Sequence, residues 1–325
     1  MADVIMVHET GGPEVLTFEK QDVGDPGPGE ARIRQEAVGL NFIDVYFRSG
    51  LYPAPAGLPF VPGNEGAGTV TALGEGVTGI SVGDRVAYVG PIGAYAGERL
   101  VPADKLITLA DGIDFNTGAA MMLKGLTACY LLNQTFRVES GHTILFHAAA
   151  GGVGLIACQW ANHLGASVIG TVGSAEKAAL AEAHGCHHTI NYNEEDFVAR
   201  VAEITGGEKC DVVYDSIGKA TYPGSLDCLK PRGLWVSFGQ SSGPIADFNL
   251  ALLAQKGSLY ATRPTLFNHI DTRARLEAMA ADLMRVVVDG AVRIEVNQTF
   301  ALKDAAEAHR ALESRKTTGA SVLIP

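Results

Sequence analysis

The stretch 145-LFHAAAGGVGLIACQW-160 constrains the fold more than any other part of this chain. An apolar, β-type run enters a glycine turn, and the residues that follow place apolar side chains on one face at helical spacing. The skeleton Ala149-x-Gly151-x-x-Gly154 is a variant of the dinucleotide fingerprint, whose glycines let the backbone approach a pyrophosphate at a helix N-terminus. A second β-type run, 167-SVIGTV-172, completes a strand–turn–helix–strand unit. The pattern predicts a site for a nicotinamide or flavin dinucleotide.

Strands and helices go on alternating after this unit. The predicted strands are 143–149, 167–172, 188–192, 210–216, 233–239 and 258–262. The predicted helices are 153–164, 174–184, 195–204, 220–230 and 249–254. Six strands separated by helical segments predict a parallel, doubly wound α/β sheet, and we place this domain at residues 126–262.

The flanking segments have a different texture. Residues 1–120 contain short β-type runs separated by Gly- and Pro-rich loops, which is typical of an antiparallel barrel. These runs are 3–8, 31–39, 67–74 and 85–90. After residue 262 the chain predicts a helix at 271–289, a strand at 292–297, a helix at 303–313 and a strand at 320–324. These elements are too few to form a domain of their own, so we expect them to rejoin the N-terminal part. The nucleotide domain is then an insertion.

Composition restricts the partners of the chain. No apolar run approaches the ~20 residues that cross a bilayer, and the N-terminus lacks a basic segment followed by an apolar one, so we expect a cytoplasmic protein without membrane contact. The net charge of −11 argues against nucleic acid as a partner.

The five cysteines include no C-x-x-C pair, which disfavours both a structural zinc site and a disulfide framework. A cluster at 184–188, His-x-Cys-His-His, is either a solvated turn or part of a metal site completed from elsewhere.

The tip of the second strand, 171-TVGSAEK-177, selects between coenzymes. NAD-specific folds place an Asp or Glu there to bind the ribose hydroxyls, whereas Gly173 and Ser174 stand at that place here. Lys177 lies one helical turn further and could neutralise a phosphate, so the sequence favours NADPH. Two alternatives remain: Lys177 is a solvated surface lysine, or Glu176 points inward in its place.

Three motifs carry a resemblance that spans the chain. The segment 39-GLNFIDVYFRSG-50 fits G-x-N-x-x-D-x-x-x-R-x-G, 62-PGNEGAGTV-70 fits P-G-x-E-G-A-G-x-V, and 141–159 carries the A-A-x-G-G-x-G turn. Together they resemble the medium-chain dehydrogenase/reductase superfamily and, within it, the zeta-crystallin-like quinone oxidoreductase branch. The resemblance implies a Rossmann domain inserted into a GroES-like catalytic domain, which is formed by residues 1–125 together with 263–325.

The same resemblance implies that the catalytic metal is absent. Zinc alcohol dehydrogenases of this superfamily have Cys where Asn41 stands, His where Asn64 stands, and a four-cysteine lobe near 85–115, where this chain has none. Two amides would hold Zn²⁺ poorly. A zinc-free member needs an acceptor that takes hydride without a Lewis acid, such as a quinone or an alkene conjugated to a carbonyl.

We therefore expect an NADPH-dependent quinone reductase that transfers hydride from nicotinamide C4. One alternative is an alkenal or enoyl reductase on the same scaffold. Another is a non-catalytic, NADPH-binding or RNA-binding crystallin-like protein, although the acidic balance argues against RNA. A short-chain dehydrogenase is discarded, because no tyrosine is followed by Lys four residues later. The edge strand 258–263 resembles the strand that pairs two subunits in this superfamily, which implies a homodimer.

The acceptor pocket is predicted at Asn41, Tyr46 and Tyr52. Asn41 could hydrogen-bond the ribose or the carboxamide of the coenzyme, or polarise an oxygen of the acceptor. The tyrosines offer aromatic walls and hydroxyl donors, or are simply rim residues of a Gly- and Pro-rich loop. Asp44 and Arg48 stand four apart in a short predicted helix, which indicates an ion pair.

The remaining cofactor contacts follow from position and from the resemblance. Gly151, Gly152, Val153 and Gly154 are expected to cradle the pyrophosphate. The further candidates are Asn41, Thr127, Tyr130, Ala149, Ala150, Gly173, Ser174, Lys177, Tyr192, Ser216, Phe238, Gly239, Gln240, Ser241, Arg263 and Lys316.

Overall fold

The computed structural model describes residues 1–325 and divides into two compact units. The first unit consists of residues 1–124, 272–284 and 294–325, and the second of residues 125–271 and 285–293. The helices α2 (Phe115–Tyr130) and α9 (Arg273–Val288) each contribute to both units. No helix is both long and apolar enough to cross a bilayer.

A six-stranded parallel sheet forms the second unit, as the alternating pattern predicts. Its strands are β8 (Thr143–Phe146), β9 (Ser167–Val172), β10 (His188–Asn191), β11 (Cys210–Asp215), β12 (Leu229–Ser237) and β13 (Tyr260–Thr262). They lie in the order β10-β9-β8-β11-β12-β13, so the winding reverses between β8 and β11. Ligands of such sheets bind outside the carboxyl ends of the strands at this switch point.

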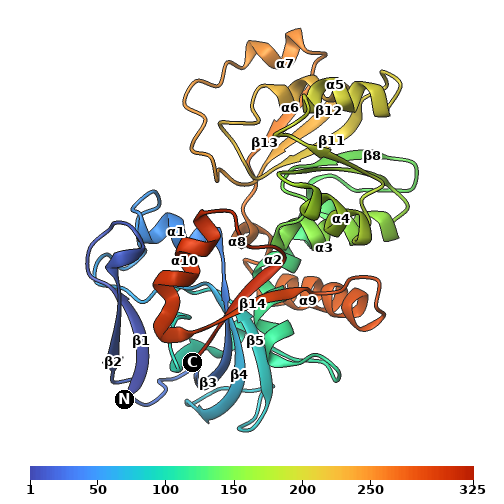
Figure 1. The fold of residues 1–325 in the computed structure, drawn as a ribbon. Helices are drawn as coiled ribbons and strands as arrows, with labels where there is room; N and C mark the ends of the chain where they lie inside the picture. Colours follow the sequence, from blue (N-terminus) through green and yellow to red (C-terminus); the bar gives the residue numbers. More distant parts are fainter. The chain divides into compact units, whose positions relative to one another are not determined.

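Helices cover both faces of this sheet. Because crossovers between parallel strands are right-handed, α3 (Gly152–His163) and α4 (Ala175–Ala183) lie on one face and α5 (Phe197–Ile204) and α6 (Gly224–Asp227) on the other (Figure 1). Alternate residues of each strand point to the same face of the sheet, and those that point toward α5 and α6 are apolar. The buried side chains there include Leu145, Ile169, Val201, Val213 and Leu226.

Two predicted elements of the second unit differ from the structure. The predicted helix 220–230 shrinks to α6, because the chain after β11 folds around the buried carboxylate of Asp215 instead. That carboxylate accepts hydrogen bonds from the Gly218 N–H at 3.0 Å and from the Thr221 hydroxyl. The predicted strand 143–149 ends early at Phe146, because Ala148 has a φ of +57° and begins the glycine turn.

The first unit contains a seven-stranded, mostly antiparallel sheet and a two-stranded hairpin. The hairpin pairs β1 (Ala2–Val7) with β2 (Leu16–Gln21). The sheet contains β3 (Glu30–Leu40), β4 (Glu65–Leu73), β5 (Arg85–Val89), β6 (Glu98–Pro102), β7 (Leu106–Thr108), β14 (Val296–Ala301) and β15 (Ala320–Ile324). Because β15 pairs antiparallel with β3, the C-terminal strands complete the N-terminal sheet, as expected.

The strand predicted at 292–297 is displaced along the sequence. The paired strand is β14, which includes the polar run Asn297, Gln298 and Thr299 and binds β15 in parallel. Val292, which began the predicted strand, is instead buried beside the end of α9, where its N–H donates to the Val286 carbonyl. The apolar side chain of Val292 therefore indicates a buried position outside the sheet and not the start of a strand.

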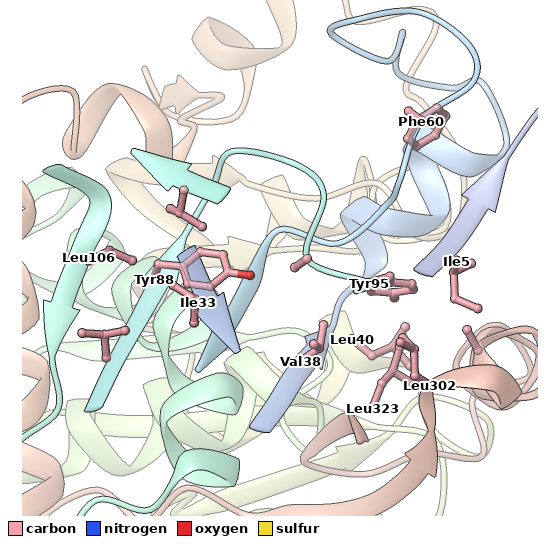
Figure 2. Close-up of a cluster of buried hydrophobic side chains, with 14 of the residues drawn as sticks. Ile5, Ile33, Val38, Leu40, Phe60, Tyr88, Tyr95, Leu106, Leu302 and Leu323 are labelled. Carbon is pink, nitrogen blue, oxygen red and sulfur yellow. The ribbon is translucent and has the colours of Figure 1, made fainter. Parts of the chain in front are cut away.

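One apolar core holds the first unit together (Figure 2). It gathers Ile33, Val38 and Leu40 from β3 with Leu323 from β15, and Leu302 enters from the turn before α10 (Ala305–Glu313). Burying such side chains stabilises a fold by about 1.5–3 kcal/mol each. The core therefore fixes both the end of β3, where Asn41 follows, and the position of α10.

Two neighbouring residues of β15 test whether this strand fills the core of the first unit. Leu323 is fully buried, whereas Ile324 is 36% exposed. We expect Leu323→Ala to lower the free energy of unfolding by about 2–5 kcal/mol because it leaves a cavity. The matched control Ile324→Ala should cost less than about 1 kcal/mol, measured by denaturant titration. Equal losses would show that β15 does not fill the core.

Candidate active site

The glycine turn between β8 and α3 forms an anion cradle. Gly151 is the N-cap of α3 and no side chain caps this helix. The first intrahelical bond runs from the Leu155 N–H to the Gly151 carbonyl at 2.9 Å, so the N–H groups of Gly152, Val153 and Gly154 precede it. Such N–H groups, together with the helix dipole, favour a bound phosphate.

Gly154 is required for this turn. A Cβ atom at Gly154 would lie 2.4 Å from the Ala148 carbonyl oxygen and 2.6 Å from that of Ala149. No other residue leaves room for so close a contact between the start of α3 and the preceding turn. Ala149 and Ala150, also predicted to lie at the cofactor, are buried in the turn itself.

The ends of β11 and β12 meet at the same edge of the sheet. A Cβ at Gly239 would lie 2.6 Å from the Ser216 carbonyl oxygen, so the two segments pass in direct contact. The Ser241 N–H donates to that carbonyl at 3.1 Å. Arg263 joins them, because its Nη1 donates to the carbonyl oxygens of Ser237 at 2.9 Å and Gly239 at 2.8 Å. The structure thus brings together the predicted residues Ser216, Phe238, Gly239, Gln240, Ser241 and Arg263.

Tyr130 is buried near the end of α2. Its ring stacks on His269 with centroids 4.4 Å apart, and it is 2% exposed. Burial raises the pKa of its phenol, against the opposing charge of Arg263. Tyr130 is therefore a neutral group, and Thr127 lies one turn earlier on the helix, half-buried.

A second group of predicted residues surrounds the end of β9. A Cβ at Gly173 would lie 2.6 Å from the Tyr192 hydroxyl, so the glycine lets this half-exposed ring lie against the strand end. The Ser174 hydroxyl caps α4 by accepting the Lys177 N–H at 3.3 Å. Lys177 therefore stands in the first turn of α4, where the helix dipole disfavours a cation by about 0.3–1 kcal/mol. A phosphate bound there would reverse this penalty.

The predicted acceptor residues lie in the first unit on and around α1 (Phe42–Arg48). Asn41 is the N-cap of α1 and is buried. The rings of Tyr46 and Tyr52 meet edge to face at 5.1 Å, and both are half-buried. Lys316 belongs to the same unit and lies in the exposed segment between α10 and β15.

Glu65 holds Asn41 in place and is itself paired with Lys124, and the sequence pattern predicted a role for neither of the two charged residues. Glu65, which is fully buried, accepts the Asn41 side-chain N–H at 2.7 Å and the Lys124 ammonium at 2.7 Å through Oε1. Its Oε2 accepts the Leu123 N–H at 2.6 Å. A signal for Lys124 existed, because it is the sole charged residue in the apolar sequence of α2.

A buried chain of hydrogen bonds runs from α10 to α1. Arg48 donates to His309 Nδ1 at 3.1 Å, so the neutral imidazole carries its proton on Nε2, which lies 3.0 Å from the Tyr95 hydroxyl. The Tyr95 hydroxyl in turn donates to Asp44 at 3.1 Å. The predicted ion pair of Asp44 with Arg48 is wrong, because Arg48 binds the carboxylate of Glu313 with two hydrogen bonds of 2.8 and 2.9 Å.

Burial shifts both titratable ends of this chain. It raises the pKa of Asp44 to about 7, although Asn64, the Asn41 N–H and Tyr95 all donate to the carboxylate. Burial, followed by the charge of Arg48, lowers the pKa of His309 to about 3. His309 is therefore uncharged at neutral pH.

The donor set at Asn41 and Asn64 does not fit zinc. Both amides turn their N–H groups toward carboxylates, Asn41 toward Glu65 and Asn64 toward Asp44 at 2.8 Å, and the Lys124 ammonium lies against Glu65. Zinc requires thiolate, imidazole or carboxylate ligands that are free to converge. No group of three or more His, Cys, Asp or Glu side chains, including the predicted alternative at 184–188, is arranged to hold a metal.

Asp44 and His309 should make stability depend on pH with opposite signs. The pKa of Asp44 in the folded protein exceeds its ordinary value, so its contribution to stability is lost as pH rises from about 4 to 7. The pKa of His309 in the folded protein is below its ordinary value, so its contribution to stability is lost as pH falls from about 6.5 to 3. Relative to the parent, Asp44→Asn should gain stability with rising pH and His309→Gln with falling pH, by up to about 1.4 kcal/mol per pH unit. Urea unfolding between pH 4 and 8 measures this, and pH-independent differences would contradict the burial of both groups.

Comparison with known proteins agrees with this geometry. Residues 27–111 match the family described as "Alcohol dehydrogenase GroES-like domain", and residues 152–282 match that described as "Zinc-binding dehydrogenase". The chain is 57% identical to a quinone oxidoreductase of Pseudomonas aeruginosa, with both chains covered in full. It is 46% identical to a 2-haloacrylate reductase of a Burkholderia species, over 100% of this chain and 99% of the relative.

The fold is also that of a solved relative. The crystal structure of the Escherichia coli quinone oxidoreductase complexed with NADPH superimposes with a TM-score of 0.98 at 50% identity, and the match covers both chains completely. Together with an amide pair that does not fit zinc, these matches identify the family. The chain belongs to the medium-chain dehydrogenase/reductase superfamily, in its zinc-free quinone oxidoreductase branch.

Proposed function

We propose that this protein is an NADPH-dependent quinone reductase that works without a metal. The observation that carries the proposal is the pair of sites along one sheet edge of the second unit, an uncapped glycine turn on α3 and a carboxylate-free strand end beside Lys177. These are the two features that a phosphorylated dinucleotide needs. Full-length similarity to quinone oxidoreductases supports the same function.

The residues of the second unit fit NADPH. The N–H groups of Gly152, Val153 and Gly154 would bind the pyrophosphate, and Lys177 with Ser174 would bind the phosphate on the adenosine ribose. Residues 126–262 are in this proposal the nucleotide-binding domain, with Tyr192 over the adenosine and Lys316 supplying a further cation. The chemistry that NADPH supplies is a hydride from nicotinamide C4.

The first unit would receive the acceptor, with residues 1–125 and 263–325 as the catalytic domain. Tyr46 and Tyr52 form an edge-to-face pair whose half-buried rings can flank a flat acceptor. Their hydroxyl groups can donate hydrogen bonds to the oxygen of a quinone as negative charge develops on it. A quinone suits such a site because its reduction yields an aromatic hydroquinone anion that hydrogen bonds and solvent can stabilise.

We further propose that the protein is a cytoplasmic homodimer. The strand β13 pairs with β12 on one side and ends the sheet on the other, and its Tyr260 is 61% exposed. An uncovered edge of this kind pairs readily with the same edge of a second subunit. None of the five cysteines forms a disulfide and all of them are buried, which suits a reducing compartment.

A second candidate function is the reduction of an activated alkene. It is favoured by the 46% identity to a 2-haloacrylate reductase, whose substrate class carries a double bond conjugated to a carboxylate. Steady-state assays with 1,4-benzoquinone and with a 2-alkenal distinguish the two. We expect a higher kcat/KM for the quinone, and dialysis against a chelator should leave the turnover unchanged, because no zinc-type donor set exists. A preference for the alkenal would favour the alkene reductase, and no turnover with either would favour a non-catalytic role.

Lys177→Glu tests the choice of coenzyme. Losing a charge-assisted contact with the ribose phosphate costs about 1.5–3 kcal/mol, so KM for NADPH should rise roughly 10- to 100-fold while KM for NADH changes little. The control Lys303→Glu makes the same charge change at an exposed lysine of the first unit and should leave both KM values unaltered. An equal rise for both coenzymes would overturn the assignment of Lys177.

A further inference from the structure

Buried polar side chains form a row across the parallel sheet of the second unit. Neighbouring strands supply three of them, because Thr171 lies near the end of β9, His147 directly follows β8 and Asp215 ends β11. Ser225 on α6 completes this polar row, and each of its side chains is at most 2% exposed. The polar row lies on the α5 and α6 face, since the rings of His147 and Phe197 meet edge to face with centroids 5.2 Å apart.

The hydrogen bonds of the polar row run in one direction. The Ser225 hydroxyl donates to Asp215 Oδ2 at 2.9 Å, because a carboxylate only accepts. The Ser225 oxygen then accepts from His147 Nε2 at 3.0 Å, and His147 Nδ1 accepts from the Thr171 hydroxyl at 2.9 Å. Burial lowers the pKa of His147, against the opposing charge of Asp215, so the ring is neutral and has one donor and one acceptor nitrogen. Each ring nitrogen is thus bonded to a different segment of the chain.

Two members of the polar row stand before segments that are proposed to bind the coenzyme. The glycine turn begins after His147, where Ala148 has a φ of +57°. The strand end with Gly173 follows Thr171 by two residues. The hydrogen bond between Thr171 and His147 therefore ties the start of the pyrophosphate turn to the start of the proposed ribose-phosphate site.

Asp215 attaches a third segment to the polar row. Its Oδ1 accepts the N–H groups of Ile217 at 2.9 Å and Gly218 at 3.0 Å, so the chain after β11 bends around the carboxylate. Its Oδ2 also accepts the indole N–H of Trp235, from β12, at 3.3 Å. Ser216, another residue proposed for the coenzyme, lies within this bend. The position of the bend is therefore fixed from the same carboxylate.

Stability alone does not require polar groups at this level of the sheet. Two positions earlier on the same three strands, the apolar residues Ile169, Leu145 and Val213 fill this face. Continuing that pattern would avoid burying hydroxyl and imidazole groups, and replacing both partners of a buried hydrogen bond by apolar groups of the same shape can be nearly neutral. What hydrogen bonds add to apolar packing is a defined distance and direction between the segments that they join.

We propose that His147 is a positioning residue for the coenzyme, which sets the spacing between the glycine turn, the Gly173 strand end and the bend at Ser216. The inference rests on the proposed function and deepens it. His147 is itself 1% exposed, so it acts through the backbone that follows it. A molecule that binds at one of these segments alone does not depend on their spacing, whereas an extended NADPH molecule that reaches all three does.

Thr171→Val tests the spacing, because it removes the hydroxyl bonded to His147 and keeps the shape of the side chain. We expect the dissociation constant for NADPH, measured by fluorescence titration, to rise at least about fivefold. The dissociation constant for adenosine 2′-monophosphate, which would occupy only the site at Gly173, Ser174 and Lys177, should stay within about twofold by calorimetric titration to millimolar concentration.

Three further variants secure the result. Thr171→Ser keeps the hydroxyl and should hold NADPH binding within about twofold of the parent. Ser225→Ala breaks the polar row on the other side of His147 and should again weaken NADPH selectively, so the test survives if Thr171→Val does not fold. The control Thr143→Val makes the same substitution at the amino end of β8 and should leave both dissociation constants unchanged.

The outcomes separate the positioning role from the proposed function. If the folded variants bind NADPH as the parent does, or lose the mononucleotide as much as NADPH, His147 has only a structural role and the inference is wrong, while quinone reduction by the parent still supports the function. If the parent neither binds NADPH nor reduces quinone, the proposed function itself fails. A selective loss of NADPH binding that Thr171→Ser does not show supports the positioning role.

Discussion

The carboxylate of Glu65 joins three segments of the first unit at one buried point. It accepts hydrogen bonds from the end of β3 through Asn41 and from α2 through Leu123 and Lys124, while it begins β4 itself. A carboxylate buried without such partners would be strongly unfavourable, and breaking a buried ion pair typically costs about 3–5 kcal/mol. Three segments distant in sequence are therefore held at one point, and α1 starts from that point.

An ammonium group and two amides satisfy the buried carboxylates at the place that the resemblance assigns to the zinc ligands of other members. Lys124 supplies the positive charge, and Asn41 and Asn64 each satisfy one of the buried carboxylates. A fixed ammonium can neutralise a carboxylate but cannot activate a bound alcohol as Zn²⁺ does. Amides in place of zinc-type ligands thus account both for the local polar network and for an acceptor that needs no Lewis acid.

Much of the second unit could be predicted from sequence, because its signals are local. The glycine turn, the six alternating strands and the tip at Gly173 all follow from periodicity and from backbone constraints within a few residues. The failures have non-local causes: the spacing predicts that Asp44 pairs with Arg48 four residues away, whereas Arg48 binds Glu313 across 265 positions. Glu65 and Lys124 lie 59 positions apart, and the helix expected at 220–230 was replaced by a turn that wraps Asp215. No spacing rule within one segment can detect such pairings.

The pairing of β15 with β3 has a consequence for how the molecule comes into being. Residues 125–271 form most of the second unit as one continuous stretch. The strand β3, in contrast, pairs with β15, which is synthesised almost 300 residues later. During translation the second unit can fold while the open edge of β3, near Leu40, still offers unsatisfied backbone groups. Until β15 is synthesised, this edge of β3 is open to pairing with another chain, which is a route to misassociation.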